Sequence, residues 1–305
     1  MKLRQRSVSA ISNLSEGFLQ IDTLAIYGVG LLGGSVGLAV KARGVARRVI
    51  GIGRSPERLA DAVKRGVVDE MTTRLEEGCG EADWIVLASA VSHIVELLPQ
   101  VAEVCKSSTI VTDVGSTKTT IVQQAERIFP QDGPFFVGSH PMAGSERSGV
   151  AHASADLFEN ACCIITPTQT TSSEALGRVE EFWRSLGALV VRLDPKRHDR
   201  AVSAVSHLPH MAAVGILLVA SEIGEEADLL AKLIGNGFRD STRVAAGPPE
   251  VWRDICVENR GPIANNLERL AEDLLLIAEE LRDGRTDRLL ERLQRAREFR
   301  KRLIP

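Results

Sequence analysis

The stretch Tyr27–Ser35, YGVGLLGGS, decides the fold of this chain. It follows the short apolar run Leu24–Tyr27 and opens a helical pattern through Val36–Val40. Three of its glycines fall in the G-x-G-x-x-G register: Gly28, Gly30 and Gly33. In a strand–turn–helix unit the first permits a tight turn, the second admits a pyrophosphate, and the third lets the helix pack closely on the sheet. The phosphates meet free N–H groups at the helix N-terminus. The motif therefore predicts a dinucleotide-binding site, with Leu31 and Leu32 among its contacts.

The turn after the next apolar run, Val49–Ile52, bears on the choice of cofactor. NAD-binding units place an acidic residue about 20 positions beyond the glycines, where it binds the ribose 2′-hydroxyl. Here Gly53 lies twenty residues after Gly33 and is followed by Arg54 and Ser55. An arginine binds a 2′-phosphate through charge-assisted hydrogen bonds, although an arginine on a solvated loop is the plainer alternative. We therefore expect NADP as the cofactor, with NAD possible, and Arg54 and Ser55 among its contacts.

Composition and charge argue against several classes of protein. The chain has 305 residues, 44% hydrophobic and 25% charged, as expected of a globular protein with room for two domains. A formal net charge of −3 gives no support for a nucleic-acid partner. The five cysteines lack C-x-x-C pairs and metal-ligand spacing, which predicts no metal site and a cytoplasmic location. The apolar run Met211–Ala220 is shorter than a membrane span, so no membrane partner is expected.

Strand-like runs alternate with helical patterns up to about residue 193. The later runs are Trp84–Leu87, Thr109–Thr112, Phe135–Val137, Cys163–Thr166 and Leu189–Val191. Beyond Asp194 only helical patterns follow: Arg200–Ser221, Ala227–Leu233, Ile263–Arg282 and Thr286–Leu303. The expected fold class is α/β, in which a basic flexible tail (1–20) precedes a Rossmann-type, doubly wound, mostly parallel sheet (21–193). An all-helical substrate and dimerisation domain (194–305) completes it. Its apolar stretch 267–281 predicts a homodimer, with packing against the first domain as the alternative.

Four polar clusters stand where strands end or helices begin: Thr112–Lys118, Gly138–Glu146, Ser206–His210 and Gly237–Arg243. Ser116 either caps the next helix or presents its hydroxyl to a ligand at the carboxyl ends of the strands. His140 follows a strand among small residues, which favours a catalytic over a structural histidine. His207 and His210 share a helical face, but no third ligand has a spacing suited to a metal. Arg243 either joins a local salt-bridge network or forks onto a substrate carboxylate.

The combination of GVGLLGGS, TDVGSTK, GSHPMAGSE, the segment from the HD pair at His198 to SHLPH, and GFRDSTR resembles the prephenate/arogenate dehydrogenase family, which includes the cyclohexadienyl dehydrogenases of tyrosine biosynthesis. The match runs in order from about residue 24 to residue 259. It implies NAD(P)-dependent oxidative decarboxylation of prephenate to 4-hydroxyphenylpyruvate, or of arogenate to tyrosine. In this reaction the ring C4 gives a hydride to the nicotinamide, the C4 hydroxyl loses its proton, and carbon dioxide leaves.

The resemblance also implies a role for each matching residue. His140 would accept the proton of the C4 hydroxyl, a task that suits an imidazole with an ordinary pKa near 6.5. Ser116 would orient that hydroxyl and the histidine, and Arg243 would bind a substrate carboxylate. The remaining matches belong to the substrate pocket: His207, His210 and Glu146. NAD-using relatives have an acid where this chain has Gly53, so the resemblance places it nearer the NADP-using branch.

Two other functions compete with this interpretation. A 3-hydroxyacid dehydrogenase or imine reductase also joins a Rossmann domain to helices, but its catalytic lysine lies later in the chain than Lys118 does here. A non-catalytic NADP-sensing protein would keep the glycine turn but would need none of Ser116, His140 and Arg243. The joint presence of these three residues favours the enzyme.

Overall fold

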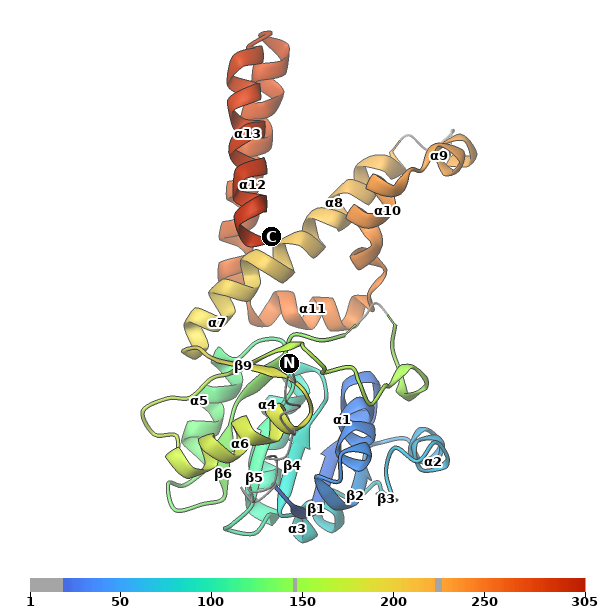
Figure 1. The fold of residues 1–305 in the computed structure, drawn as a ribbon, viewed down its shortest axis with the longest axis vertical. Coiled ribbons are helices and arrows are strands. Elements are labelled where there is room, and N and C mark those ends of the chain that lie inside the picture. Colours follow the sequence, from blue (N-terminus) through green and yellow to red (C-terminus); the bar gives the residue numbers. More distant parts are fainter. Residues whose placement is uncertain (1–18, 145–146, 223–226, 305) are drawn as a thin grey trace, which may run out of the picture.

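A six-stranded parallel sheet forms the centre of the amino-terminal domain (Figure 1). The computed structural model describes residues 19–144, 147–222 and 227–304. The strands lie in the order β3-β2-β1-β4-β5-β6, and every neighbouring pair is parallel. Their bounds are β1 (Ile21–Tyr27), β2 (Ala46–Ile52), β3 (Glu70–Thr72), β4 (Trp84–Leu87), β5 (Ile110–Asp113) and β6 (Phe135–Val137). The strand order reverses between β1 and β4, which is where such sheets bind ligands at their carboxyl ends. The predicted Rossmann-type fold is confirmed.

Helices cover both faces of this sheet, because successive residues of a strand point to opposite sides. Leu24 and Ile26 of β1 join one hydrophobic core, whereas Ala25 and Tyr27 join the other. The first core is closed by α1 (Leu31–Ala42) and α6 (Ser173–Ser185). The second is closed by α3 (Leu75–Glu81), α4 (Val91–Val104) and α5 (Thr119–Ile128). Burial on both faces explains why the central strands are continuous apolar runs.

The last three strands form a separate sheet, which the sequence pattern did not predict. β7 (Ser139–Pro141) is antiparallel to β8 (Cys162–Ile165), and β8 is parallel to β9 (Leu189–Arg192). The chain leaves β6 at Gly138, where an added Cβ would come within 2.6 Å of the Thr166 Oγ1. The close approach of the Thr166 side chain thus favours a glycine here, directly before β7, the strand that carries His140.

The carboxy-terminal domain is helical over its described residues. Its elements are α7 (Pro195–Val202), a π-helical turn (Ser203–His207), α8 (Leu208–Ser221), α9 (Ala227–Leu233), α10 (Asn236–Thr242), a 3₁₀ turn (Arg243–Ala246), α11 (Pro249–Glu258), α12 (Arg260–Arg282) and α13 (Thr286–Leu303). The predicted helices of α9 and α13 are confirmed to the residue. Helix α10 was not predicted, because Gly235 and Gly237 interrupt the sequence pattern. Figure 1 shows α8 and the α12–α13 hairpin diverging above the sheet domain as two arms.

One continuous helical run joins the two domains and extends from Pro195 to Ser221, 27 residues. The sequence pattern placed its start at Arg200, but Asp194 caps it earlier by accepting hydrogen bonds from the backbone of Lys196 and Arg197. By length and composition the run could cross a membrane, which corrects the expectation that no segment reaches that length. Its buried polar residues His198, Asp199, Ser203 and His207 instead tie it to the folded protein.

Candidate active site

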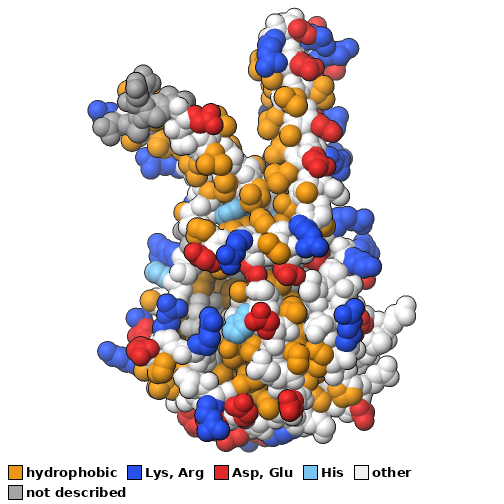
Figure 2. Space-filling model, turned by 180° about the vertical axis from the view of Figure 1, so that it is seen from behind, with side chains coloured by type: hydrophobic (Ala, Val, Ile, Leu, Met, Phe, Trp, Pro, Cys, Tyr) orange, Lys and Arg blue, Asp and Glu red, His pale blue; other side chains and the backbone are white. Residues whose placement is uncertain are grey.

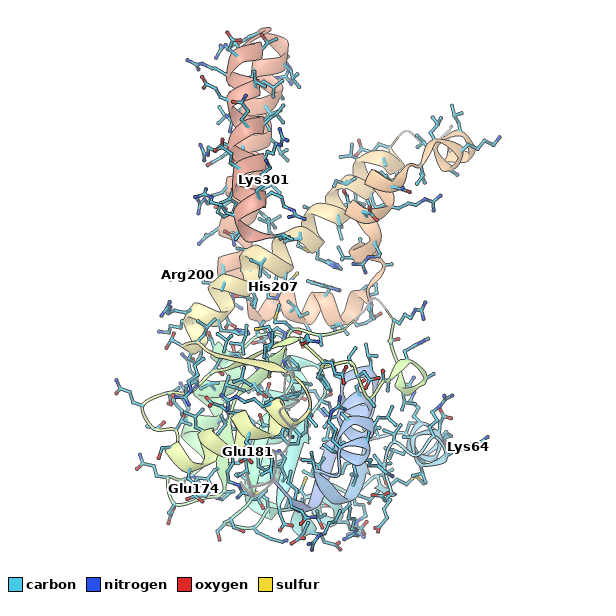
Figure 3. All side chains as sticks on the ribbon, viewed as in Figure 1. Lys64, Glu174, Glu181, Arg200, His207 and Lys301 are labelled. Atoms are coloured by element: carbon cyan, nitrogen blue, oxygen red, sulfur yellow. The ribbon has the colours of Figure 1, made fainter. Side chains whose placement is uncertain are left out.

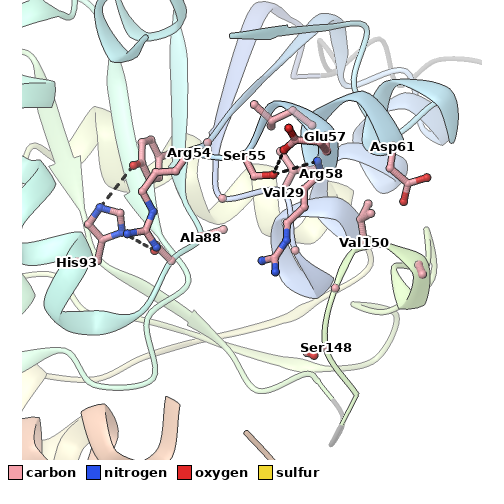
Figure 4. Close-up of a pocket in the computed structure, with 18 residues that line it drawn as sticks. Val29, Arg54, Ser55, Glu57, Arg58, Asp61, Ala88, His93, Ser148 and Val150 are labelled. Carbon is pink, nitrogen blue, oxygen red and sulfur yellow. Dashed lines mark hydrogen bonds between the residues drawn. The ribbon is translucent and has the colours of Figure 1, made fainter. Parts of the chain in front are cut away.

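Two connected cavities form one cleft along the carboxyl ends of the strands and the adjoining helical domain. The first, about 870 Å³, lies over β1 and α2 (Pro56–Lys64), as Figure 4 shows. The second, about 610 Å³, reaches from α1 to α11. Both are lined by Gly30, Ala88, Ser89, Ser148 and Gly149, so they are continuous. An extended ligand can therefore bind in the first cavity, with one of its ends next to a second molecule that is bound in the second cavity.

The glycine turn has the geometry of a dinucleotide cradle. A Cβ on Gly28 would come within 2.3 Å of the Ala88 carbonyl oxygen, and one on Gly33 within 2.1 Å of the Gly28 carbonyl oxygen. Gly30 differs, because nothing lies within 4 Å of its Cβ position and it borders both cavities. Helix α1 begins directly after it with no side-chain cap, which leaves its first N–H groups available to phosphate oxygens. The turn therefore fits the pyrophosphate of a dinucleotide.

The far end of the first cavity carries charges of both signs. The Ser55 hydroxyl donates to the Glu57 carboxylate at 2.7 Å and accepts from the backbone N–H of Arg58 at 3.3 Å, so it caps α2. Figure 4 shows Arg58 reaching into the cavity toward Ser148, while Arg54 lies beside His93. Two guanidinium groups (Arg54 and Arg58) and two carboxylates (Glu57 and Asp61) thus line the cavity where the ribose of a bound dinucleotide would lie.

Four residues predicted from the sequence meet in the second cavity. Ser116, His140, His207 and Arg243 line it together with Trp252. Ser116 lies in the loop after β5, and His140 lies on β7. His207 belongs to the π-helical turn, Arg243 to the 3₁₀ turn and Trp252 to α11. Figure 3 shows His207 where the helical domain meets the sheet domain. Leu31 and Leu32 of the glycine turn line the same cavity, so the end of a bound dinucleotide would lie beside these side chains.

A buried ion pair supports the loop that carries Ser116. Lys118 and Asp113 are fully buried, and the Lys118 ammonium contacts the Asp113 carboxylate and the Ser139 carbonyl oxygen, the latter at 2.9 Å. The same carboxylate accepts from the backbone of Gly115 at 2.8 Å and of Ser139 at 3.1 Å. Burial lowers the pKa of Lys118, although the charge of Asp113 opposes this shift. The pair therefore connects the Ser116 loop to the strand that carries His140.

His140 is a buried base in the cleft whose pKa is lowered. It is 8% exposed, and its Nδ1 lies 2.8 Å from the Nε2 of His198. Desolvation lowers its pKa well below 6.5, and the charges of His198, Lys118 and His207 lower it further. Burial also lowers the pKa of His207 to about 4. Both histidines are therefore neutral near pH 7, and a neutral imidazole has a lone pair with which it can accept a proton.

Comparison with known proteins shows which family has this architecture. Residues 36–192 match the family model described as prephenate dehydrogenase, nucleotide-binding domain, and residues 194–295 match prephenate dehydrogenase, dimerization domain. The chain belongs to the prephenate dehydrogenase family. It is 34% identical over 280 residues to the prephenate dehydrogenase of Bacillus subtilis, covering 92% of this chain and 75% of that relative. Identity to the cyclohexadienyl dehydrogenase of Zymomonas mobilis is 27%, over 91% of this chain and 94% of the relative.

Solved structures of the family share the whole architecture. The prephenate dehydrogenase of Aquifex aeolicus, in complex with hydroxyphenyl propionate and NAD+, is 32% identical with a TM-score of 0.85, covering 92% of this chain and 98% of the other. Arogenate dehydrogenase of Synechocystis is 28% identical with a TM-score of 0.77, over 92% and 100% of the two chains. Two 3-hydroxyisobutyrate dehydrogenases, at 16% and 14% identity, share the fold alone. Lys118 is buried in its ion pair and does not line the cleft, which argues against that chemistry here.

Three residues that match the family, His210, Glu146 and Ser116, differ in how they stand to the cleft. His210 stacks on Trp252 with ring centroids 3.4 Å apart and is not among the residues lining the cleft, so it supports Trp252 from behind. Glu146 lies outside the described residues. Ser116 does not cap α5, because the backbone N–H groups of Lys118 and Thr119 donate to another carboxylate, that of Asp199. The Ser116 hydroxyl is therefore not used as a helix cap, and it can hydrogen-bond to a ligand in the cleft.

Two residues that shape the site, Arg58 and Asn259, were not singled out from the sequence. His198, Asp199 and Trp252 stood within the motifs and clusters, but the sequence pattern assigned none of them a role. The His198–Asp199 pair carries a weak signal, since two polar residues interrupt the buried face of a helix. Nothing in the sequence indicates that they reach the base of His140, 58 residues away, or the start of α5, 81 residues from Asp199. Arg58 lies three residues beyond Ser55 in the first turn of α2, so the helix cap at Ser55 is the sequence signal that places it beside the cofactor turn.

Proposed function

We propose that the chain catalyses the oxidative decarboxylation of prephenate, arogenate or both, in tyrosine biosynthesis, with reduction of a nicotinamide dinucleotide. The observation that carries this proposal is the convergence of Ser116, His140 and Arg243 in a cavity continuous with the dinucleotide cradle. Family membership supports it. A protein that only senses NADP would need the cradle but not a buried neutral histidine, a hydroxyl and a guanidinium beside it.

Each residue has a task that its surroundings support. The neutral His140 takes the proton of the C4 hydroxyl, and Ser116 orients that hydroxyl by a hydrogen bond. Arg243 pairs with a substrate carboxylate, and His207 contributes a hydrogen bond from the opposite wall. A bound nicotinamide supplies the acceptor for the C4 hydride. As C4 becomes a carbonyl carbon, the ring–carboxylate bond breaks, carbon dioxide leaves, and the oxygen regains its proton as the ring becomes a phenol.

We also propose that NADP is preferred over NAD. Gly53 leaves no carboxylate at the end of β2, and Arg54 and Arg58 both line the cavity there. The carboxylate of Glu57 accepts a hydrogen bond from Ser55, which holds it within the cap of α2. Two guanidinium groups favour a 2′-phosphate over a neutral hydroxyl. The Aquifex enzyme was solved with NAD+, so this proposal distinguishes the present chain from that relative.

A homodimer through the helical domain, 194–305, is the third part of the proposal. Leucines and valines on the arms remain exposed, among them Leu218 at 61%, Val219 at 67% and Leu275 at 63%. Figure 2 shows hydrophobic side chains along both arms. An apolar surface of this kind is typical of an interface, and the matched family domain is described as a dimerization domain. We also propose a cytoplasmic location, which suits five cysteines that form no disulfide.

Light scattering tests the dimer directly. Leu275→Glu should lower the mass from two chains to one, because a buried unpaired carboxylate opposes association. Leu189→Glu is the matched control, since Leu189 is 59% exposed on β9 of the other domain. A dimer that survives Leu275→Glu would locate the interface elsewhere.

The proposed activity is tested by a two-by-two assay of prephenate or arogenate with NAD or NADP, following the reduced nicotinamide. Turnover is expected in at least one combination, with NADP the better cofactor. Absence of turnover in all four, with NADP shown to bind, would favour the sensing protein.

A further inference from the structure

A hydrogen-bond network behind the cleft joins both site histidines to Asp199: His140 through His198 to its carboxylate, and His207 through Asn259 to its backbone carbonyl oxygen. One carboxylate oxygen, Oδ1, lies 2.8 Å from the Nδ1 of His198 and accepts the backbone N–H of Lys118 at 2.7 Å. The other, Oδ2, accepts the backbone N–H of Thr119 at 2.9 Å. Burial by itself would raise the pKa of Asp199, but the hydrogen bonds from His198, Thr119 and Lys118 lower it overall. Asp199 is therefore an ionised group that only accepts hydrogen bonds.

The network determines which nitrogen of His140 carries its proton. Because Asp199 only accepts, the Nδ1 of His198 carries the proton of that neutral ring, and its Nε2 is bare. His198 Nε2 then accepts from the Nδ1–H of His140 at 2.8 Å. The Nε2 of His140 is left without a proton. The hydrogen-bond partners thus assign the tautomer of His140.

The same argument gives the opposite result for His207. The Asn259 side-chain amide lies 2.8 Å from the backbone carbonyl oxygen of Asp199, and a carbonyl oxygen only accepts. The group facing it is therefore the Asn259 NH₂. That NH₂ also lies 3.1 Å from the Nδ1 of His207, so this nitrogen is the acceptor and the proton of the neutral ring is on Nε2.

We propose that His198, Asp199 and Asn259 are positioning residues that hold His140 and His207 in opposite tautomers. One wall of the cleft then presents a bare nitrogen from His140, and another presents an N–H from His207. The bare nitrogen of His140 can accept a hydrogen bond only from a donor, such as a hydroxyl. The N–H of His207 can donate a hydrogen bond only to an acceptor, such as a carboxylate or keto oxygen. The kinetic interpretation rests on the proposed function, whereas the tautomers themselves do not.

The two branches of the network differ in what they control. The His198 branch acts on the base, so breaking it should lower kcat, because the wrong tautomer of His140 has no lone pair facing the hydroxyl. The Asn259 branch acts on a hydrogen bond that holds the substrate before and during reaction, so breaking it should raise KM. A purely structural role for both residues would move stability without separating kcat from KM.

The first test is ¹⁵N NMR of histidine-labelled full-length protein at neutral pH, without substrate, because the two ring nitrogens report the tautomer. His140 should carry its proton on Nδ1 and His207 on Nε2, with resonances assigned from single substitutions. Any other pair of tautomers would overturn the proposal, whether or not the protein turns over prephenate or arogenate. Absence of turnover with the expected tautomers would count against the proposed function alone.

Kinetics of paired variants give the second test. His198→Leu removes the acceptor and should lower kcat by about 10²- to 10⁴-fold. His198→Gln is the matched control, because its amide oxygen reaches the position of Nε2 and should restore much of the rate and the His140 tautomer. Asn259→Leu should raise KM for substrate by about tenfold, the effect of losing one hydrogen bond. Equal losses in His198→Gln and His198→Leu, or a kcat unchanged in both, would contradict the proposal. If His198→Leu does not fold, His198→Gln and the tautomers of the unmodified protein still decide it.

Discussion

The two ends of the cleft are built in opposite ways. At the dinucleotide end, the backbone turn around Gly30 is the cradle, and the charged side chains Arg54, Glu57 and Arg58 are exposed. At the substrate end, His140 and His207 are 8% and 1% exposed and are held from behind by other buried polar groups. The first end consists of short local segments of one domain, whereas the second is assembled from both domains.

This difference predicts how the two ends respond to substitution. Exposed charges interact through water, so each one makes a modest and independent contribution to the free energy of cofactor binding. A buried, hydrogen-bonded network loses much more when one member is removed, because its partner is left unpaired away from water. Substitutions at the substrate end should therefore have the larger effects.

The largest effect is expected at His140. His140→Asn should lower kcat by about 10³-fold or more, because the cleft loses its base, while NADP binding remains nearly unchanged. Steady-state kinetics and cofactor titration measure both quantities. His152→Asn is the control, since His152 is exposed at the end of the 3₁₀ turn Val150–His152 and does not line the cleft. A near-normal rate in His140→Asn would remove His140 from the mechanism.

The next effect is expected at Arg243. Arg243→Gln should raise KM for substrate by about 10- to 100-fold, because a carboxylate loses a charge-assisted hydrogen bond. Arg253→Gln removes the same charge from an exposed position of α11 and should leave KM unchanged. If KM is the same in Arg243→Gln as in the unmodified protein, Arg243 does not bind the substrate carboxylate.

A smaller effect is expected at the dinucleotide end. Gly53→Asp should lower the preference for NADP over NAD by about tenfold, through repulsion of the 2′-phosphate. The substitution has room, because the added Cβ would lie 3.4 Å from the Leu59 side chain. Gly53→Asn controls for size without charge. Equal kcat/KM ratios for Gly53→Asp and Gly53→Asn would show that charge at this turn does not select the cofactor.

The smallest effect is expected from moderate acid. The base must be unprotonated, and burial lowers the pKa of His140 well below 6.5, as do the charges of His198, Lys118 and His207. Activity should thus be retained as pH falls from 8 to 6.5, within about twofold, and be lost only at lower pH as His140 gains a proton. The profile of kcat/KM against pH measures this. An acidic limb centred at or above pH 6.5 would mean that His140 is not held in a desolvated site.

Features that depend on short-range geometry could be predicted from the sequence. The glycine turn, the cap of α2 at Ser55 and the span of α13 follow from residues within a few positions of one another. Ser116, His140, His207 and Arg243 were identified from motifs, and the fold brings them to one cavity.

The groups that lie behind those side chains could not be predicted from local sequence patterns. The partner of His140 is His198, 58 residues away, and the partner of His207 is Asn259, 52 residues away. The same holds for the second sheet, in which β7 pairs with β8, more than 20 residues further along the chain. Local patterns record the preferences of the backbone and the spacing of apolar residues. The direction of a buried hydrogen bond depends on which groups folding brings together, and no local pattern contains that information.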